Sequence, residues 1–283
     1  MTLSAAMNDS QFDLSLKSGR IRVRRIGSST APLVLFVHGL SAHMHSFDHI
    51  IEKVANSAIQ LVALDLRGRG RSEISPTGSY GLDAHARDVL EAATLLGADR
   101  FDLVGWSMGA LIGICIAQCA PERLGKLVLI DHAGKMDPAA IAKIEKGLTR
   151  LDMTVEQPTA YIAAVRAASG ITPWTPFWEH YYQYELGPVQ QGYQATTNKA
   201  ACMEDLADAM RIDWSGKWSA LTMPTLLIRC QIPIGGGFVV PEAVRDALRK
   251  VVPNIKTLEV NLDHYAVMTD EATADAIKKF LGN

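Results

Sequence analysis

The chain has 283 residues, of which 48% are hydrophobic, so it is long enough to bury the core of one large domain. The formal net charge of −2, and the lack of any apolar run near the ~20 residues of a membrane helix, argue against nucleic acid and membranes as partners. The start, MTLSAAMNDS, lacks the basic-then-apolar order of a secretory signal, and the four cysteines show no CxxC spacing; we therefore expect a reduced, cytoplasmic protein.

Strands and helices are predicted to alternate along the chain. Residues 11–18 and 19–27 have the period-two pattern of an opening hairpin. Continuous apolar runs then predict buried parallel strands at 33–39, 61–66, 101–106, 126–131, 225–230 and 256–261. Apolar residues at helical spacing lie between them at 82–97, 108–119, 241–251 and 270–281. This alternation predicts an α/β fold with a doubly wound, mostly parallel sheet.

One long stretch, from about Gly134 to Ala220, interrupts this alternation. It contains helical segments and the aromatic cluster PWTPFWEHYYQY (173–184), but no convincing buried strand. The chain leaves the sheet once and returns once, which favours an insertion over a separate domain. We therefore predict an α/β core formed by 1–133 and 221–283, with a helical cap at 134–220.

The strongest chemical signal is GWSMG (105–109), which follows an apolar strand and precedes an apolar helix. This G-x-S-x-G pattern between a strand and a helix is typical of a nucleophile elbow. Glycines are needed there because the turn is too tight for a Cβ beside the serine. Ser107 is therefore the candidate nucleophile.

The chain resembles the α/β-hydrolase family over nearly its whole length. The resemblance rests on HGL (38–40), DLRGRGRS (65–72), GWSMG and DHYAVMTDE (263–271). It implies that His264, which follows the last strand, is the base that activates the serine. It also implies that the backbone N–H groups of Leu40 and Met108 form the oxyanion hole.

The third catalytic group is not at its common position in this family. The stretch TLLIRCQIPIGGGFVVPEAV (225–244) has no carboxylate before Glu242, which reads as a helix-start residue. Asp263 is adjacent to the base, and adjacent side chains diverge. Asp131 ends the strand KLVLID, and a minority of α/β-hydrolases carry the acid there, including enzymes similar to the amide hydrolase of vitamin B6 breakdown and the cofactor-free dioxygenases of quinoline breakdown. Asp131 is therefore the predicted acid, and its neighbour His132 is expected to face the opposite side.

Aromatic and histidine side chains are candidates for the substrate pocket, because rings enclose an apolar substrate while polar groups orient it. The run HMHSFDH (43–49) has a spacing that resembles metal binding, yet it reads better as the start of a helix beside the pocket, and we predict no metal site. The predicted pocket residues are His43, His45, Trp106, Trp174, Trp178 and Tyr181.

Together these features predict a serine hydrolase that cleaves a small-molecule ester, lactone or amide without a cofactor. Different functions stay open on the same fold. A cofactor-free dioxygenase would use the histidine–aspartate pair to deprotonate an aromatic substrate. The fold would also suit a carbon–carbon bond hydrolase or a non-enzymatic ligand receptor. The substrate, and whether the protein is a monomer or a dimer, do not follow from the sequence.

Overall fold

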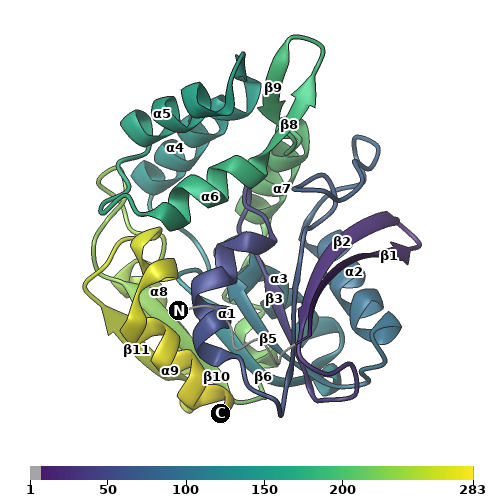
Figure 1. Cartoon of the computed structure of the whole chain (residues 1–283). Coiled ribbons are helices and arrows are strands. Elements are labelled where there is room, and N and C mark those ends of the chain that lie inside the picture. The colour runs from purple at the N-terminus through teal and green to yellow at the C-terminus, as the bar shows by residue number, and fades with distance from the viewer. Residues whose placement is uncertain (1–7, 283) are drawn as a thin grey trace.

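A mixed, mostly parallel sheet is the centre of the computed structural model, which describes residues 8–282 (Figure 1). Its strands are β1 (Asp9–Leu16), β2 (Gly19–Ile26), β3 (Leu33–Val37), β4 (Gln60–Leu64), β5 (Phe101–Trp106), β6 (Leu124–Ile130), β10 (Thr225–Cys230) and β11 (Lys256–Val260). They lie in the order β1-β2-β4-β3-β5-β6-β10-β11. The β1–β2 hairpin is antiparallel and joins β4 antiparallel, whereas the pairs from β4 to β11 are parallel. The predicted fold class is confirmed.

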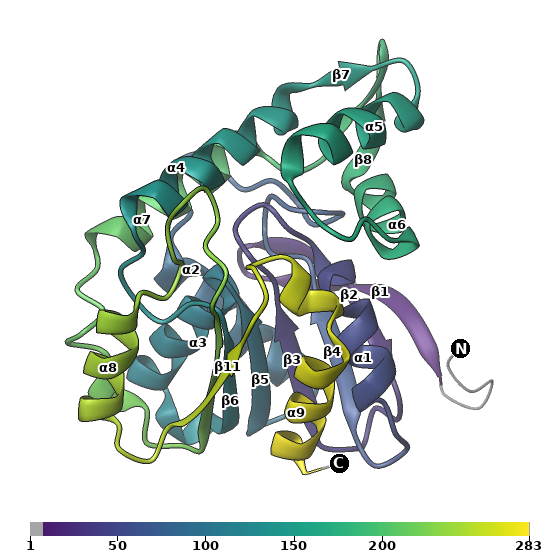
Figure 2. The same cartoon turned by 90° about the vertical axis from the view of Figure 1, so that its left-hand side faces the viewer.

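Helices cover both faces of this sheet, which explains why its inner strands are apolar at every position. In β3, Leu33, Leu35 and Val37 face one hydrophobic cluster, while Val34 and Phe36 face the other. The first cluster includes α2 (Leu82–Leu95), α3 (Met108–Cys119) and α8 (Glu242–Val251). The second includes α1 (Asp48–Val54) and α9 (Glu271–Leu281), which pack against each other. Figure 2 shows these two helical layers on opposite sides of the strands.

The cap lies between β6 and β10 and covers one edge of the sheet (Figure 2). Its helices are α4 (Pro138–Gly147), α5 (Pro158–Ser169), α6 (Pro176–Glu185) and α7 (Lys199–Arg211). The cap also contains a small sheet in the order β7 (Thr154–Val155), β9 (Gly192–Ala195) and β8 (Leu186–Val189). The prediction of a purely helical cap was wrong on this point. These strands are two to four residues long and largely half-exposed, so they carry too little apolar pattern to be recognised.

Short 3₁₀ helices complete the chain: η1 (Met44–Phe47), η2 (Pro121–Arg123), η3 (Leu148–Asp152), η4 (Trp218–Ala220) and η5 (Ala266–Thr269). Within residues 8–282, no helix combines the length and the apolar character required to cross a membrane. The thiols of Cys115, Cys119, Cys202 and Cys230 are free.

A close contact between α3 and the end of β3 makes Gly109 irreplaceable. A Cβ at Gly109 would lie 1.9 Å from the backbone oxygen of Val37, and backbone cannot move aside as a flexible side chain can. We expect Gly109→Ala to lower the free energy of unfolding by about 1–3 kcal/mol or more, as other overpacked sites do. Thermal and urea unfolding measure this effect.

Gly147→Ala is the matched control, because Gly147 has a helical φ of −63° and no atom within 4 Å of its Cβ position. Alanine favours a helix over glycine by about 0.5–1 kcal/mol, so this variant should be as stable as the parent or more so. Equal stability of the two variants would contradict the proposed contact.

Candidate active site

Ser107 lies on a strained turn between β5 and the first residue of α3. Its backbone has φ 56° and ψ −122°, a conformation that residues with a Cβ rarely adopt. The turn is possible because both flanking glycines meet backbone: a Cβ at Gly105 would lie 2.3 Å from the oxygen of Gly109. A serine with these strained backbone angles, between two closely packed glycines, has the geometry of a nucleophile elbow.

His264 forms a buried hydrogen bond with Asp131. The distance from His264 Nδ1 to Asp131 Oδ2 is 2.9 Å, and the two side chains are 5% and 2% exposed. An ionised carboxylate can only accept, so Nδ1 carries the proton and Nε2 is left with a free lone pair. The sequence-predicted pairing of these two residues is therefore present in the structure.

The end of β10 contributes a hydrogen-bond donor to the same carboxylate. Asp131 follows β6 with a φ of 47°, and its Oδ1 accepts the backbone N–H of Cys230 at 2.9 Å. Asp263, which is next to the histidine in sequence, instead accepts the N–H groups of Tyr265 and Ala266, both at 2.8 Å, through Oδ1. Its carboxylate therefore shapes its own loop.

Trp106 supports the histidine from the nucleophile strand. Its indole Nε1 donates to the backbone oxygen of His264 at 3.2 Å, and the two rings lie 5.3 Å apart. The residue that precedes Ser107 therefore fixes the backbone of His264.

Two hydrogen bonds of His38 fix the peptide group between Gly39 and Leu40 in the loop after β3. The N–H of Leu66 donates to His38 Nε2 at 3.0 Å, so the His38 proton is on Nδ1, which donates to the oxygen of Gly39 at 2.7 Å. Burial lowers the pKa of His38 to about 3, so the ring is neutral. In a trans peptide the carbonyl and N–H point in opposite directions, which turns the Leu40 N–H away from His38.

A cavity of about 210 Å³ brings the core and cap residues together. Ser107, His264, Leu40 and Met108 line it, all four as expected from the sequence. Gly39 permits the close approach of the loop, because a Cβ there would lie 3.1 Å from the Cβ of Ser107. The site therefore combines a serine, a histidine with a free nitrogen, and two backbone segments around one space.

The predicted pocket residues separate into two groups. The first lines the cavity and consists of Trp106, Trp178 and Tyr181. The second, His43, His45 and Trp174, is not among the lining residues. His43 stacks on Tyr181 at 4.0 Å and contacts its backbone oxygen at 3.0 Å through Nε2, so it supports a cavity ring from behind.

The other two side chains are directed elsewhere. His45 Nδ1 lies 2.8 Å from Asp48 Oδ2, and the ring of Trp174 stacks on Tyr182 with 5.6 Å between centroids. The aromatic run at 173–184 thus supplies both lining rings and rings that hold the cap together. Residue type alone could not separate these roles, because both need large apolar surfaces.

A comparison with known proteins identifies the family of this chain. The model of the alpha/beta hydrolase fold matches residues 32–270. The chain belongs to the α/β-hydrolase family.

Proteins similar to this chain differ in how much of it they match. A 2-(acetamidomethylene)succinate hydrolase from Mesorhizobium japonicum is 26% identical over 279 residues, covering 93% of the chain and 92% of the relative. A 3-hydroxybutyrate-oligomer hydrolase from Cupriavidus necator is 30% identical over 155 residues, and the chain spans about half of that relative, 53%. The crystal structure of E-2-(acetamidomethylene)succinate hydrolase superposes with a TM-score of 0.87 at 22% identity, covering 98% of this chain and all of that one.

In this α/β-hydrolase, His132 lines the cavity beside the candidate site, so the expectation that it faces the opposite side was wrong. Consecutive residues of a strand point to opposite faces, but the positive φ of Asp131 breaks that alternation. Burial, followed by the neighbouring imidazole of His264, lowers the pKa of His132 to about 4. The ring is therefore neutral and adds polarity to the wall without charge.

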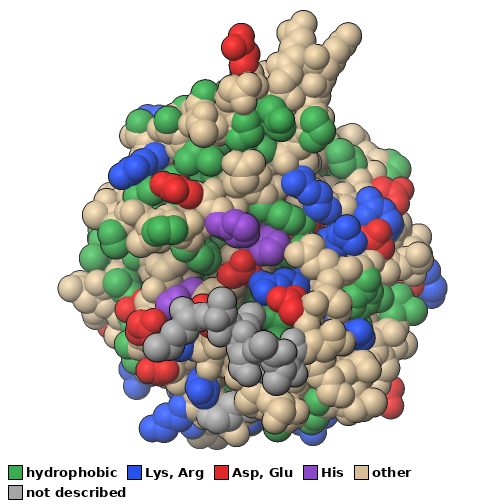
Figure 3. All heavy atoms as spheres, viewed as in Figure 1, with side chains coloured by type: hydrophobic (Ala, Val, Ile, Leu, Met, Phe, Trp, Pro, Cys, Tyr) green, Lys and Arg blue, Asp and Glu red, His purple; other side chains and the backbone are tan. Residues whose placement is uncertain are grey.

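Histidine side chains also gather on the face where the cap meets the core, beside acidic and basic side chains (Figure 3). There, ligand atoms of His45, Asp48 and His180 lie within 4.8 Å of one another, the only such group found in residues 8–282. Arg24 Nη1 binds Asp48 Oδ1 at 2.7 Å, so a guanidinium already neutralises this carboxylate. The ion pair of Arg24 with Asp48 therefore accounts for this carboxylate, and His180 of α6 contacts the group through its ring, 5.9 Å from that of His45.

The buried neutral histidines predict a pH dependence of stability. His38 and His132 have folded pKa values of about 3 and 4, below the 6.5 of an unfolded histidine. The unfolded chain therefore binds more protons as the pH falls, and the contribution to stability, complete above pH 6.5, is lost on acidification. We expect the free energy of unfolding to fall between pH 6.5 and 5, by up to about 1.4 kcal/mol per pH unit for each histidine.

Urea unfolding at several pH values measures this slope. His132→Gln should reduce it, whereas substitution of the exposed His180 by Gln should leave it unchanged. An unchanged slope in the His132 variant would contradict a buried, neutral ring at this position.

Proposed function

We propose that this protein is a serine hydrolase that cleaves a small-molecule ester, lactone or amide through an acyl-enzyme. The observation that carries the proposal is the buried His264–Asp131 hydrogen bond in the same cavity as the strained Ser107. Ser107 is the nucleophile, His264 the base and Asp131 the acid that orients it. The backbone N–H groups of Leu40 and Met108 are the proposed oxyanion donors.

In the proposed reaction, His264 Nε2 takes the hydroxyl proton of Ser107 as the oxygen attacks the substrate carbonyl. The carbonyl oxygen becomes negative and accepts hydrogen bonds from the N–H groups of Leu40 and Met108. His264 then donates the proton to the leaving group as the carbonyl bond to it breaks. Water, deprotonated by the same nitrogen, attacks the acyl group and releases the acid and free Ser107. The protons balance over the two half-reactions.

We further propose that the substrate carries a carboxylate. The walls of the cavity include Lys143, Lys146 and Arg150, whereas its one acidic lining residue is Asp205. Asp205 is paired with Arg69, and Arg150 with Glu185. Lys143 and Lys146 have no ion pair within residues 8–282, so their charges are available to an anion. A relative named as a succinate hydrolase is consistent with this inference.

The first prediction concerns the acid. Oδ1 of Asp131 accepts the N–H of Cys230, so in Asp131→Asn the amide NH₂ would face His264 Nδ1 and place the histidine proton on Nε2. That tautomer cannot accept the serine proton. We expect a loss in kcat of about 10⁴-fold, as in a serine protease with the comparable substitution. Turnover of an aryl ester at matched folding, judged by melting temperature, measures the effect.

Asp263→Asn and Glu242→Gln are the controls, and each should lower kcat by about tenfold or less. Asp263 keeps its acceptor as asparagine, and Glu242 is the first residue of α8. Ser107→Ala should abolish turnover and labelling by a fluorophosphonate. Ester turnover that survives Ser107→Ala but not Asp131→Asn would contradict the acyl-enzyme, because it would show that His264 activates water directly.

The second prediction concerns the carboxylate. Phenyl hydrogen succinate and phenyl 4-methylpentanoate differ by a carboxylate in place of an isopropyl group of the same shape. After subtraction of spontaneous hydrolysis, we expect a higher kcat/KM for the succinate ester. Lys143→Met should reduce this preference by about three- to tenfold, since a partly exposed ion pair contributes roughly 1 kcal/mol.

Lys135→Met is the matched control, because Lys135 is exposed and outside the cavity lining. The Lys135→Met variant should prefer the succinate ester over the 4-methylpentanoate ester as strongly as the parent enzyme does. Equal kcat/KM values for both esters in the parent enzyme would rule out a carboxylate-selective pocket, while leaving the serine mechanism intact.

A further inference from the structure

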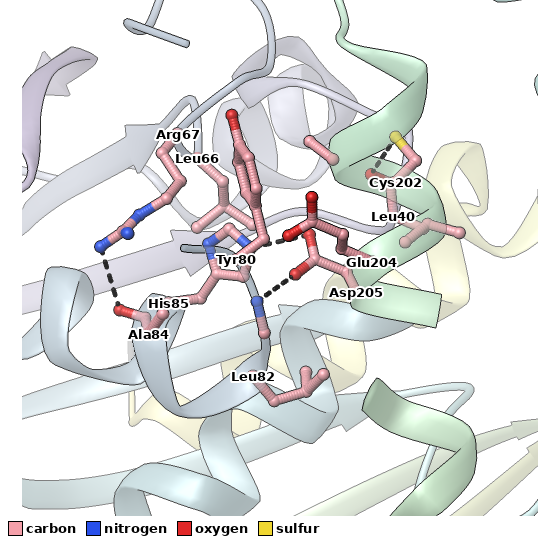
Figure 4. Close-up of polar contacts among 12 residues, drawn as sticks. Leu40, Leu66, Arg67, Tyr80, Leu82, Ala84, His85, Cys202, Glu204 and Asp205 are labelled. Carbon is pink, nitrogen blue, oxygen red and sulfur yellow. Dashed lines mark hydrogen bonds and ion pairs between the residues drawn. The ribbon is translucent and has the colours of Figure 1, made fainter. Parts of the chain in front are cut away.

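The backbone oxygen of Leu40 is held from two separate elements. Arg69, in the loop after β4, donates to it from Nε at 3.0 Å. Cys202, on cap helix α7, donates from Sγ at 3.4 Å, as Figure 4 shows. The preceding peptide is oriented by His38, so both peptide groups that flank the Cα of Leu40 have a fixed direction.

Arg69 is in turn held by a carboxylate of the cap. Its side chain and that of Asp205 on α7 are both fully buried, and Nη2 binds Asp205 Oδ2 at 2.5 Å. Nη1 donates to the backbone oxygen of Arg67 at 3.1 Å. The planar guanidinium therefore spans from the Leu40 carbonyl at one end to the cap carboxylate at the other, which fixes its plane.

Asp205 has further donors around it, so its position is strongly determined. Its Oδ1 accepts the N–H of Gly81 at 2.6 Å. Its Oδ2 lies 2.8 Å from Nε2 of His85, which Figure 4 shows beside it. Burial alone would raise the pKa of Asp205, but Arg69, His85 and this N–H lower it to about 2. The carboxylate is therefore charged at neutral pH.

We propose that Asp205 is a positioning residue which, through Arg69, holds the Leu40 N–H in the geometry of the oxyanion hole. The inference rests on the proposed serine mechanism and adds that cap helix α7 is part of the apparatus that stabilises the transition state. The cap then does more than enclose substrate, because a shift of α7 moves an oxyanion donor.

The chemistry of this arrangement separates it from a simple cap anchor. An anchor requires only that α7 be bound to the core, whereas here the buried ion pair ends on the carbonyl next to a proposed oxyanion donor. An oxyanion donor acts on charge that develops in the transition state, so its displacement reduces kcat and leaves ground-state binding nearly unchanged. An anchor that only encloses substrate would change KM or stability instead.

Asp205→Asn tests the proposal. One amide oxygen cannot replace two carboxylate oxygens that accept three donors, and the new NH₂ group would face one of those donors. We expect a fall in kcat of about 10- to 100-fold with KM within about threefold, since displacement by 1 Å can cost roughly 100-fold. Asp208→Asn is the matched control on the same helix: Asp208 accepts the N–H of Leu82 at 2.9 Å, outside the Leu40 network.

A transition-state probe gives the decisive readout. A trifluoromethyl ketone forms a hemiketal with Ser107 whose oxygen occupies the oxyanion hole, whereas the matching methyl ketone binds without forming that charge. In Asp205→Asn we expect the inhibition constant of the trifluoromethyl ketone to rise 10- to 100-fold and that of the methyl ketone to stay within about twofold. Parallel weakening of both inhibitors would show that the residue only shapes the cavity, and would overturn the proposal.

Cys202 gives a second test that keeps the ion pair and therefore does not depend on the stability of Asp205→Asn. Cys202→Ala removes the thiol donor to Leu40, and Cys202→Ser restores a donor of similar size. We expect the alanine variant to lose about three- to tenfold in kcat and in trifluoromethyl ketone affinity, and the serine variant to recover most of both. Equal kcat and equal trifluoromethyl ketone affinity in the alanine and serine variants would show that the hydrogen bond to the Leu40 carbonyl does not position the oxyanion donor.

Failure of the proposed function is distinguishable from failure of this inference. If the parent enzyme has no turnover that depends on Ser107 and does not react with a fluorophosphonate, the serine mechanism is wrong and the inference falls with it. If the parent is active and both Asp205→Asn and Cys202→Ala keep full kcat and trifluoromethyl ketone affinity, the mechanism holds and the positioning role is wrong.

Discussion

Hydrogen bonds between the ends of three neighbouring parallel strands hold the candidate site together. The N–H of Ser107 donates to the oxygen of Ile130 at 2.9 Å, which ties the turn after β5 to β6. The N–H of Asp131 donates to the oxygen of Ile228 at 2.8 Å, which ties the end of β6 to β10. Because parallel strands carry their carboxyl ends to the same edge, this register places the serine and the carboxylate side by side before any side-chain contact forms.

The ends of β6 and β10 divide the support of the histidine between them. The end of β6 supplies the carboxylate, and the end of β10 supplies the N–H of Cys230 that binds its second oxygen. A carboxylate with both oxygens bonded cannot rotate, so the ring of His264 is held in one orientation. Because the end of β6 carries the carboxylate, the loop after β10 does not need an acidic residue. Gly235 and Gly236 of that loop instead adopt positive φ angles in a tight turn.

Buried charge binds the cap to the core in addition to apolar packing. The pair of Arg69 with Asp205 crosses from core to cap, and Arg150 of the cap donates both to Glu185 and to the oxygen of Ser41. Removing one member of such a pair leaves an uncompensated charge in a low dielectric, at a cost of several kcal/mol. The cap is therefore fixed in register with the loop after β3, which apolar contact alone would not specify.

The sequence by itself determined the fold class and the residues with local signals. The continuous apolar strands predicted the sheet, and the two glycines of GWSMG indicated Ser107 as the candidate nucleophile. The resemblance to α/β-hydrolases implied His264 and, with the absence of an acid in 231–240, indicated Asp131 as its partner. The strands and the turn at Ser107 were predictable because the spacing of a strand and the tightness of a turn are encoded within a few neighbouring residues. The residues that face the cavity were only partly predictable.

Only the tertiary structure decided the features that depend on distant segments. It placed His132 in the cavity through the backbone twist at Asp131, and it separated lining rings from supporting rings in the cap. It also joined Arg69 to Asp205 across 136 positions of sequence. An arginine in a glycine-rich loop and an aspartate in a helix carry no local sign of each other, because burial, which makes their contact strong, exists only after the chain has folded.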